Sequence, residues 1–286
     1  MKIIVLLIVL TGFMSCFQPK QTELTDRLTY SKSDSLIVIK KIKTFSKYQS
    51  APTQKTFENI ALSFIGTPYV AHTLETDTSE SLVINLNAFD CTTFIETCLA
   101  LSITVKNKKA GFNDYTNNLK QIRYRKASID NYSSRLHYFT EWISKNAQND
   151  FIINITQELG GVAYQKNIDF MSTHSSAYRQ LTSDTTLIPT IKEIETQLSN
   201  CEQYYIPKED IENIESIIES GLIVAFTTSI NGLDIIHTGI TTRVGNEVRL
   251  LHASSDLNKV TISEKTLAQY IIGNKLQSGI MLIKIE

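Results

Sequence analysis

One segment constrains this chain more than any other, the run Phe89–Glu96, in which Cys91 follows Asp90 and opens a stretch with apolar residues at helical spacing. Aspartate is a preferred N-cap residue, so we expect a helix that begins at Cys91 and continues to about Lys106. Its predicted buried stripe consists of Phe94, Cys98, Leu101 and Val105. A thiol in the first turn of a helix lies at the positive end of the macrodipole, which favours the thiolate. The segment therefore predicts a reactive cysteine at a helix N-terminus.

Two histidines far downstream lie in segments rich in β-branched residues, and these segments read as neighbouring strands. His237 could take the thiol proton and later protonate a leaving amine. His252, one strand further on, could accept a hydrogen bond from His237 and hold its orientation, as the third member of a triad does. Taken singly, a cysteine on an amphipathic helix is usually part of the core, and a histidine in a strand is usually a satisfied polar group. The order cysteine, histidine, polar residue is what favours catalysis.

The chain places helical patterns first and strand patterns second, which indicates an α+β fold with an antiparallel sheet. Helices are predicted over residues 34–47, 53–64, 91–106, 114–123, 136–146, 210–220 and 263–272, and strands over residues 82–86, 222–230, 233–243, 248–253 and 280–285. Asn231-Gly232 is a strong hairpin turn signal. Residues 150–205 contain no secure signal. We expect one domain over residues 33–286.

The N-terminus has the features of an export signal. Lys2 precedes the apolar run Ile3–Leu10, which is too short to span a membrane, so residues 1–15 are predicted to be a signal peptide. Cys16 follows a small residue, as at a bacterial lipoprotein cleavage site, and we expect it to be lipid-modified. Residues 16–32 would then be a polar tether, and the mature protein would be periplasmic and anchored to a membrane. The alternative is an ordinary signal peptide or N-terminal anchor in which Cys16 is incidental.

Charge and cysteine content exclude several classes of partner and cofactor. The net charge is −1, which offers no electrostatic case for nucleic acid. Three cysteines remain beyond the signal, and an odd count does not indicate a disulfide framework. Cys91 and Cys98 would be about 10 Å apart along the helix, too far to bridge. We expect Cys98 to be a buried small hydrophobe, and Cys201 to be either similar or a surface thiol. No ligand pair has the spacing of a structural zinc site, and no metal, organic cofactor or obligate protein partner is indicated.

The short sequence motifs around these residues resemble those of a known group, the N-acetylmuramoyl-L-alanine amidase-like branch of the NlpC/P60 cysteine peptidases. This group has a papain-like fold and is common in Bacteroidetes. The resemblance runs from about Phe57 to the C-terminus. The motifs that carry the resemblance are Gly66-Thr67-Pro68-Tyr69, Phe89 to Glu96, Ser134 to Phe139, Met171-Ser172-Thr173-His174, His237-Thr238-Gly239 and His252-Ala253-Ser254-Ser255. Each is weak alone, and six in this order are a strong signal.

The resemblance implies roles for the matching residues. Cys91 matches the nucleophile, His237 the base and His252 the orienting residue. Tyr69 matches a tyrosine that lines the site and whose hydroxyl can help polarise the scissile carbonyl. Thr92 stands in the place of a serine that contacts substrate.

The motif from Ser134 to Tyr138, which is specific to this branch of the family, is expected to face the substrate. It comprises Ser134, Arg135, His137 and Tyr138, and Arg135 could pair with a peptide carboxylate. An equally weighted alternative makes Arg135 and His137 structural polar contacts. His174 either lines the cleft or is simply exposed.

The function implied by the resemblance is that of a cysteine-dependent peptidoglycan amidohydrolase that cuts the N-acetylmuramoyl-L-alanine amide of muropeptides. One alternative is an endopeptidase that cuts between D-glutamate and the diamino acid, as the wider family does. Another is a catalytically inactive, lipid-anchored protein that binds the cell wall. One departure from the wider family, Gly221-Leu222 in place of Gly-Asp, concerns loop geometry and neither the nucleophile nor the base.

Overall fold

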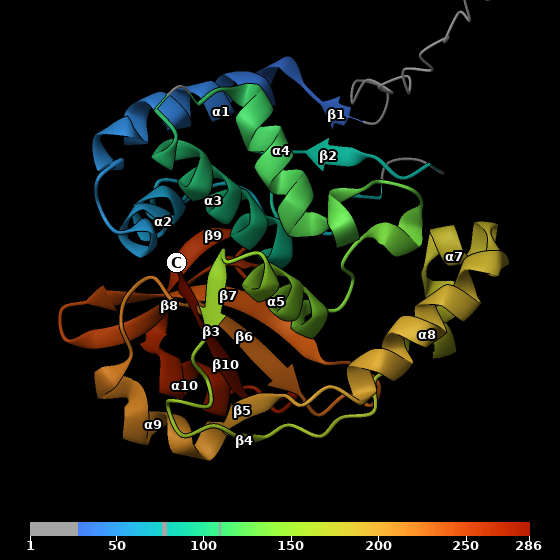
Figure 1. The fold of residues 1–286 in the computed structure, drawn as a ribbon. Helices are drawn as coiled ribbons and strands as arrows, with labels where there is room; N and C mark the ends of the chain where they lie inside the picture. Colours follow the sequence, from blue (N-terminus) through green and yellow to red (C-terminus); the bar gives the residue numbers. More distant parts are fainter. Residues whose placement is uncertain (1–27, 76–78, 109) are drawn as a thin grey trace, which may run out of the picture.

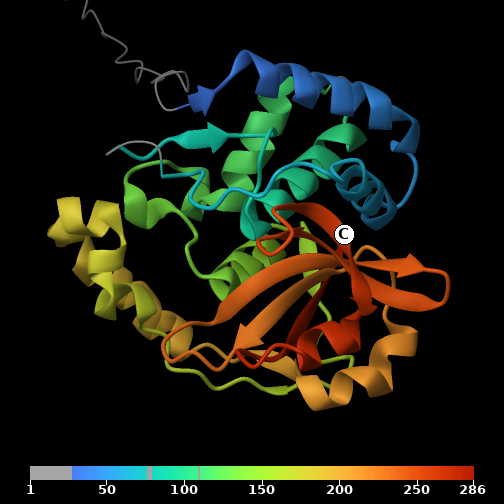
Figure 2. The same ribbon diagram turned by 180° about the vertical axis from the view of Figure 1, so that it is seen from behind.

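The computed structural model describes residues 28–75, 79–108 and 110–286. A helical half and a sheet half pack against each other, as Figure 1 shows, and Figure 2 shows the same division from behind. The helical half contains α1 (Lys32–Phe45), α2 (Thr53–Leu62), α3 (Cys91–Lys106) and α4 (Phe112–Arg123). α5 (Phe139–Gln148) follows, and then α6 (Phe170–Thr173), α7 (Arg179–Ser183) and α8 (Ile188–Ser199) form one flank of the molecule. The mixed α+β class predicted from the sequence is confirmed.

The main sheet is antiparallel throughout and carries both histidines. Its strand order is β4 (Val162–Ala163), β5 (Tyr204–Pro207), β10 (Gln277–Ile285), β6 (Ile223–Thr228), β7 (Ile235–Val244), β8 (Glu247–Ser254) and β9 (Lys259–Thr266), with β3 (Ile152–Asn154) paired to β10. β6, β7 and β8 are hairpin neighbours, and the connection between β6 and β7 contains Gly232 at φ +78°. This connection covers residues 229–234, so it is longer than the two-residue turn that the sequence predicts. The meander of predicted strands is therefore confirmed.

Alternation along the strands gives the sheet two buried faces. On β6, Ile223 and Ala225 join the core under α3, whereas Val224 and Phe226 join a second core with α9 (Ile211–Ile214) and α10 (Leu267–Ile272). Figure 1 places α9 and α10 on the side of the sheet away from α3. The sheet is thus covered on both sides, and packing on both faces fixes the positions of its strands relative to α3.

Helix α3 lies in the centre of the core, and its bounds confirm the prediction. The Asp90 side chain accepts a hydrogen bond from Thr93 N at 2.7 Å, and the Thr93 hydroxyl accepts one from Asp90 N at 3.0 Å, which forms a capping box. From Thr93 onward nearly every side chain of α3 is buried, so the buried surface is wider than the predicted stripe. Cys98 is fully buried, and Cys201 is exposed.

Several boundaries differ from the sequence prediction. The predicted helix over 263–272 is wrong in its first part, because residues up to Thr266 continue β9 and pair with β8, and α10 begins only at Leu267. The predicted helix over 210–220 is reduced to α9 and flanking 3-10 turns, with Ile217 61% exposed. α8 lies in the region without a predicted element.

The proposed export signal and Cys16 lie outside the described residues. Leu28–Tyr30, inside the predicted tether, form β1, which pairs in parallel with β2 (Leu82–Ile84). Within the described ranges no helix is both long and apolar enough to cross a membrane.

Candidate active site

Cys91 is the first residue of α3 and lines a cavity of about 160 Å³ between the helical half and β7. Its side chain is half-buried. The Thr238 hydroxyl donates to the Cys91 carbonyl at 2.9 Å, which holds β7 against the start of the helix. The cavity is also lined by Thr92 and His237, so the predicted nucleophile and base meet at one cavity.

The electrostatic surroundings of Cys91 differ from those expected from the macrodipole alone. Burial, followed by the Asp90 carboxylate, raises the pKa of the Cys91 thiol, while hydrogen bonds from Thr238 and Thr92 act in the opposite direction. The same Asp90 that caps the helix therefore disfavours the thiolate beside it. The resting side chain is a neutral thiol at neutral pH.

His237 on β7 and His252 on β8 are hydrogen-bonded, with 2.8 Å between His237 Nε2 and His252 Nδ1. Their rings lie 5.0 Å apart at 80°. Burial and the neighbouring His252 lower the pKa of His237 to about 3, and burial lowers the pKa of His252 to about 4, partly opposed by Asp256. Both imidazoles are therefore neutral. A neutral His237 that donates from Nε2 has an unprotonated Nδ1, which is the nitrogen able to accept a thiol proton.

Two aromatic residues that the sequence analysis did not single out enclose the histidine pair. Phe226 stacks on His237 at 5.7 Å and 29°, and Tyr270 of α10 meets His252 edge-on at 5.4 Å. Phe226 is the residue directly opposite His237 in the β6–β7 register. The predicted hairpin register could have identified Phe226, whereas nothing local in the sequence identifies Tyr270.

Tyr69 lies close to the nucleophile. It forms a parallel bridge with Phe89, two residues before Cys91, and Val70 N donates to Phe89 O at 2.9 Å. Burial, followed by the charges of Cys91 and Asp90, raises the pKa of the Tyr69 phenol. Tyr69 is therefore a neutral hydrogen-bond donor beside the thiol.

His137 and Tyr138 line the Cys91 cavity. His137 Nε2 lies 2.7 Å from Tyr132 O, and burial, followed by the Arg135 charge, lowers the pKa of His137 well below its usual range. The Tyr138 hydroxyl donates to Glu195 Oε1 at 2.7 Å. Both residues are thus held by contacts outside the cavity that they line.

Four of the predicted substrate contacts are not among the residues that line this cavity: Tyr69, described above, and Ser134, Arg135 and His174. The Arg135 guanidinium binds both oxygens of Glu80, each at 2.8 Å, and Glu75 at 2.7 Å. Ser134 Oγ donates to Asn131 O at 2.6 Å. His174 is exposed and stacks on Phe170 at 4.3 Å. For Arg135 this placement favours the structural alternative.

Asp234 is a cavity residue that the sequence analysis missed. It is 1% exposed, and its Oδ2 accepts hydrogen bonds from Thr140 N and Thr140 Oγ1, both at 2.8 Å. Burial raises the pKa of this carboxyl. Among the described residues that line the cavity, Asp234 is the one carboxylate, and none is lysine or arginine.

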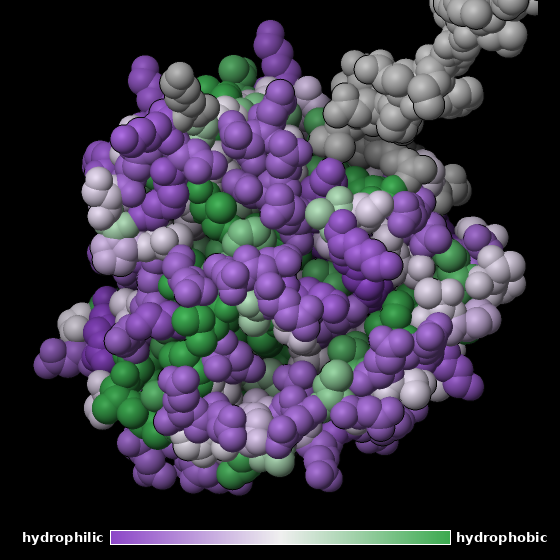
Figure 3. All heavy atoms as spheres, viewed as in Figure 1, coloured by the Kyte–Doolittle hydropathy of each residue, from purple (hydrophilic) through white to green (hydrophobic). Residues whose placement is uncertain are grey.

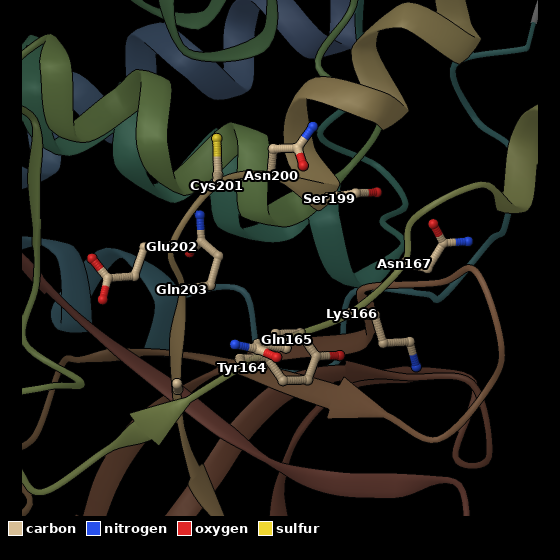
Figure 4. Close-up of a pocket in the computed structure, with 10 residues that line it drawn as sticks. Tyr164, Gln165, Lys166, Asn167, Ser199, Asn200, Cys201, Glu202 and Gln203 are labelled. Carbon is tan, nitrogen blue, oxygen red and sulfur yellow. The ribbon is translucent and has the colours of Figure 1, made fainter.

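A larger hollow lies elsewhere, between residues 163–167 and 199–203 (Figure 4). Its volume is about 640 Å³, and amide and hydroxyl side chains dominate its lining, with Cys201 among them. Tyr164 lines this hollow, and its hydroxyl donates at 2.9 Å to the carbonyl of Asp234, which lines the Cys91 cavity. Figure 3 shows that this face of the molecule is largely hydrophilic.

A thiol at a helix start, at one cavity with a half-buried histidine that is hydrogen-bonded to a buried one, is an arrangement that can supply a nucleophile, a base and a residue that orients the base. Residues 59–280 match the family model AmiA-like, described as N-acetylmuramoyl-L-alanine amidase-like, and the chain belongs to this family. Across the described ranges, no group of three or more histidine, cysteine or acidic residues is arranged to hold a metal ion.

Solved structures show the same fold. An N-acetylmuramoyl-L-alanine amidase from Bacteroides uniformis is 36% identical, with a TM-score of 0.77, and the match covers 82% of this chain and 99% of that one. A Bacteroides fragilis protein described as a candidate xylanase is 34% identical, with a TM-score of 0.75 and coverage of 79% and 99%. Protein LPG0564 from Legionella pneumophila shares the fold at 19% identity and a TM-score of 0.68, with coverage of 90% and 97%. The comparison with curated proteins gave no match.

Proposed function

We propose that this protein is a cysteine-dependent amidohydrolase that cuts the amide between N-acetylmuramic acid and L-alanine in muropeptides. Two findings support this choice of scissile bond: membership of the amidase-like family, and 36% identity to a structure that is named as that amidase. The observation that carries the mechanism is the 2.8 Å contact between His237 Nε2 and His252 Nδ1 beside the cavity of Cys91.

In the proposed acylation step, His237 Nδ1 takes the Cys91 proton as Sγ attacks the lactyl carbonyl carbon. The resulting oxyanion is stabilised by the backbone N–H groups of Cys91 and Thr92 at the start of α3, and by the Tyr69 hydroxyl. The C–N bond then breaks, and the His237 imidazolium gives its proton to the departing L-alanine nitrogen. The products of this step are the free peptide and a thioester on Cys91.

Deacylation follows the same path with water as nucleophile. Neutral His237 takes a proton from water, the hydroxide oxygen attacks the thioester carbonyl, and the thiolate leaves and recovers the proton. The muramoyl carboxylate is released.

The raised thiol pKa and the lowered histidine pKa determine the order of events. A preformed thiolate–imidazolium pair is disfavoured, because burial opposes both charges. Proton transfer therefore accompanies attack rather than preceding it. His252 matters in this scheme because it selects the His237 tautomer and supports the transient imidazolium.

A glycosidase mechanism has less support from the site. Glycoside hydrolysis usually requires two carboxyl groups that flank the bond, and Asp234 is the one carboxylate among the described cavity-lining residues. An amide substrate requires the nucleophile and base that the site contains.

The test is incubation of the protein with defined muropeptides, with products identified by mass spectrometry and a Cys91→Ala variant as control. Free stem peptide and intact sugar support the proposal. A cut between D-glutamate and the diamino acid supports an endopeptidase instead, and absence of any product from folded protein supports a wall-binding role.

We also propose that the protein is exported and lipid-anchored through Cys16, on the basis of the N-terminal sequence. The expected result is membrane fractionation of the full-length chain, abolished by Cys16→Ala. Unchanged fractionation of that variant would refute lipidation.

A further inference from the structure

We propose that the stem peptide of the substrate binds in the pocket between the end of β8, β9 and α10, where Lys265 and Lys275 recognise its carboxylates. This inference rests on the proposed function, because it concerns the orientation of the same substrate at the same site. The pocket has a volume of about 530 Å³. It is distinct from the 160 Å³ cavity of Cys91.

The pocket reaches one of the two histidines directly and the other through a hydrogen bond. His252 and Tyr270 are part of its lining, and His252 Nδ1 lies 2.8 Å from His237 Nε2. Burial, followed by the charges of Asp256 and Cys91, raises the pKa of Tyr270 to about 12. The phenol of Tyr270 is thus near both an acidic residue of the pocket and the nucleophile. A group in this pocket would lie beside His252, which is one hydrogen bond away from the imidazole that protonates the leaving amine.

The two spaces beside the histidines differ in charge. The described lining of the Cys91 cavity has no lysine or arginine and contains the buried carboxylate of Asp234, so it disfavours anions. The other pocket is lined by two lysines, Lys265 and Lys275, and two acidic residues, Asp256 and Glu264. Within the described part of the chain, none of these four has an ion-pair partner within 4.0 Å.

The proposed substrate has a matching asymmetry across its scissile bond. The lactyl and sugar side carries no charge, whereas the stem peptide carries the carboxylates of D-glutamate and the diamino acid together with an ammonium group. Unpaired lysines beside unpaired carboxylates suit such a mixed-charge peptide. The small cavity suits the neutral lactyl group attached to the reacting carbonyl. Arg135 cannot supply the cation, because its guanidinium is bound to Glu80 and Glu75.

The test compares two substrates that share the scissile amide, N-acetylmuramoyl-L-alanine and N-acetylmuramoyl-L-alanyl-D-glutamyl-diamino acid. The variant is the double charge reversal Lys265→Glu and Lys275→Glu in the full chain, and Lys40→Glu, an exposed lysine on α1, is the matched control. For the double variant we expect KM for the tripeptide substrate to rise about tenfold with kcat unchanged, and KM for the short substrate to rise much less. High salt should reduce the difference. Equal effects on both substrates, or none, would overturn the inference.

A binding measurement separates this inference from the proposed function. The free tripeptide L-alanyl-D-glutamyl-diamino acid is titrated into Cys91→Ala protein, with and without the two lysine substitutions. Binding that the double substitution abolishes and Lys40→Glu preserves supports the pocket. Binding that is unaffected refutes it. If the wild type cuts no muramoyl-alanine amide, the proposed function fails, and the titration still decides whether the pocket holds the peptide.

Discussion

Removal of His252 is expected to slow the reaction without unfolding the protein. The side chain of His252 is buried, and its Nδ1 is the contact for His237 Nε2 at 2.8 Å. In His252→Ala the His237 ring loses the contact that fixes its tautomer and orientation. The Phe226 and Tyr270 rings remain, so the imidazole stays in place but is free to present either nitrogen.

The size of the effect follows from the charge state of the pair. Both histidines are neutral in the resting protein, because burial lowers the pKa of His237 to about 3 and that of His252 to about 4. A neutral hydrogen bond contributes about 0.5–1.5 kcal/mol, which alone is a factor of roughly 2–12. Loss of the correct tautomer removes part of the general-base contribution, which is about 10²–10⁴ in total. We therefore expect kcat to fall about 10²-fold, with KM little changed.

Steady-state kinetics on a muropeptide, with thermal unfolding as the check on folding, measures this effect. His252→Gln is the matched variant, since its amide oxygen can still accept the hydrogen bond, and it should retain activity within about tenfold of wild type. A folded His252→Ala protein with kcat within threefold of wild type would refute the orienting role.

Three further predictions concern pH and stability. Because His237 is the base in its neutral form and burial lowers its pKa to about 3, kcat/KM should persist well below pH 6.5 as the pH falls, and an acid limb centred near 6.5 in a pH–rate profile would contradict this. Arg123→Met leaves buried Glu96 without its 2.7 Å partner and should lower the free energy of unfolding, measured in urea, by about 3–5 kcal/mol. A second substitution, Glu96→Leu, should restore most of this stability. A loss below about 1 kcal/mol in Arg123→Met would count against a tightly coupled pair. Asp90→Ala removes the acceptor for Thr93 N at 2.7 Å and should lower the free energy of unfolding by about 1 kcal/mol, whereas a stability equal to wild type would show that the cap contributes nothing.

Helix α3 was predictable because its signals are local. Asp90 at the cap, the cysteine at the first helical position and the apolar residues after it specify both ends without knowledge of any partner. The β6–β7 hairpin was predictable for the same reason, because Asn231-Gly232 is a local turn signal, although the strands end earlier than predicted and the register shifts between Phe226 and Thr227. That register places His237 opposite Phe226.

The boundary at Thr266 was not predictable from local pattern. Thr266 pairs with Arg249 of β8 and also caps α10, so tertiary pairing decides where the strand ends. α8 was missed although Ile191, Ile194 and Leu198 lie at helical spacing, because polar and apolar residues alternate closely through the region before it.

The candidate site likewise contains some residues that local sequence signals identify and others that only tertiary packing reveals. The thiol and the two histidines could be named from the sequence, since each lies on an element with a clear local signal. Asp234 and Tyr270 could not, because their roles depend on the packing of α5 and α10 against the sheet. The direction of the Cys91 pKa shift likewise depends first on burial, which the local sequence does not show.

The central claim is that the Cys91 thiol, activated by His237, cuts the muramoyl–alanine amide. Its most direct test is mass spectrometry of a short incubation with a muropeptide, stopped by acid to preserve thioesters. The account predicts free stem peptide and a muramoyl adduct on Cys91 in wild type, and neither product with Cys91→Ala. Stem peptide released at an undiminished rate by folded Cys91→Ala protein would contradict it.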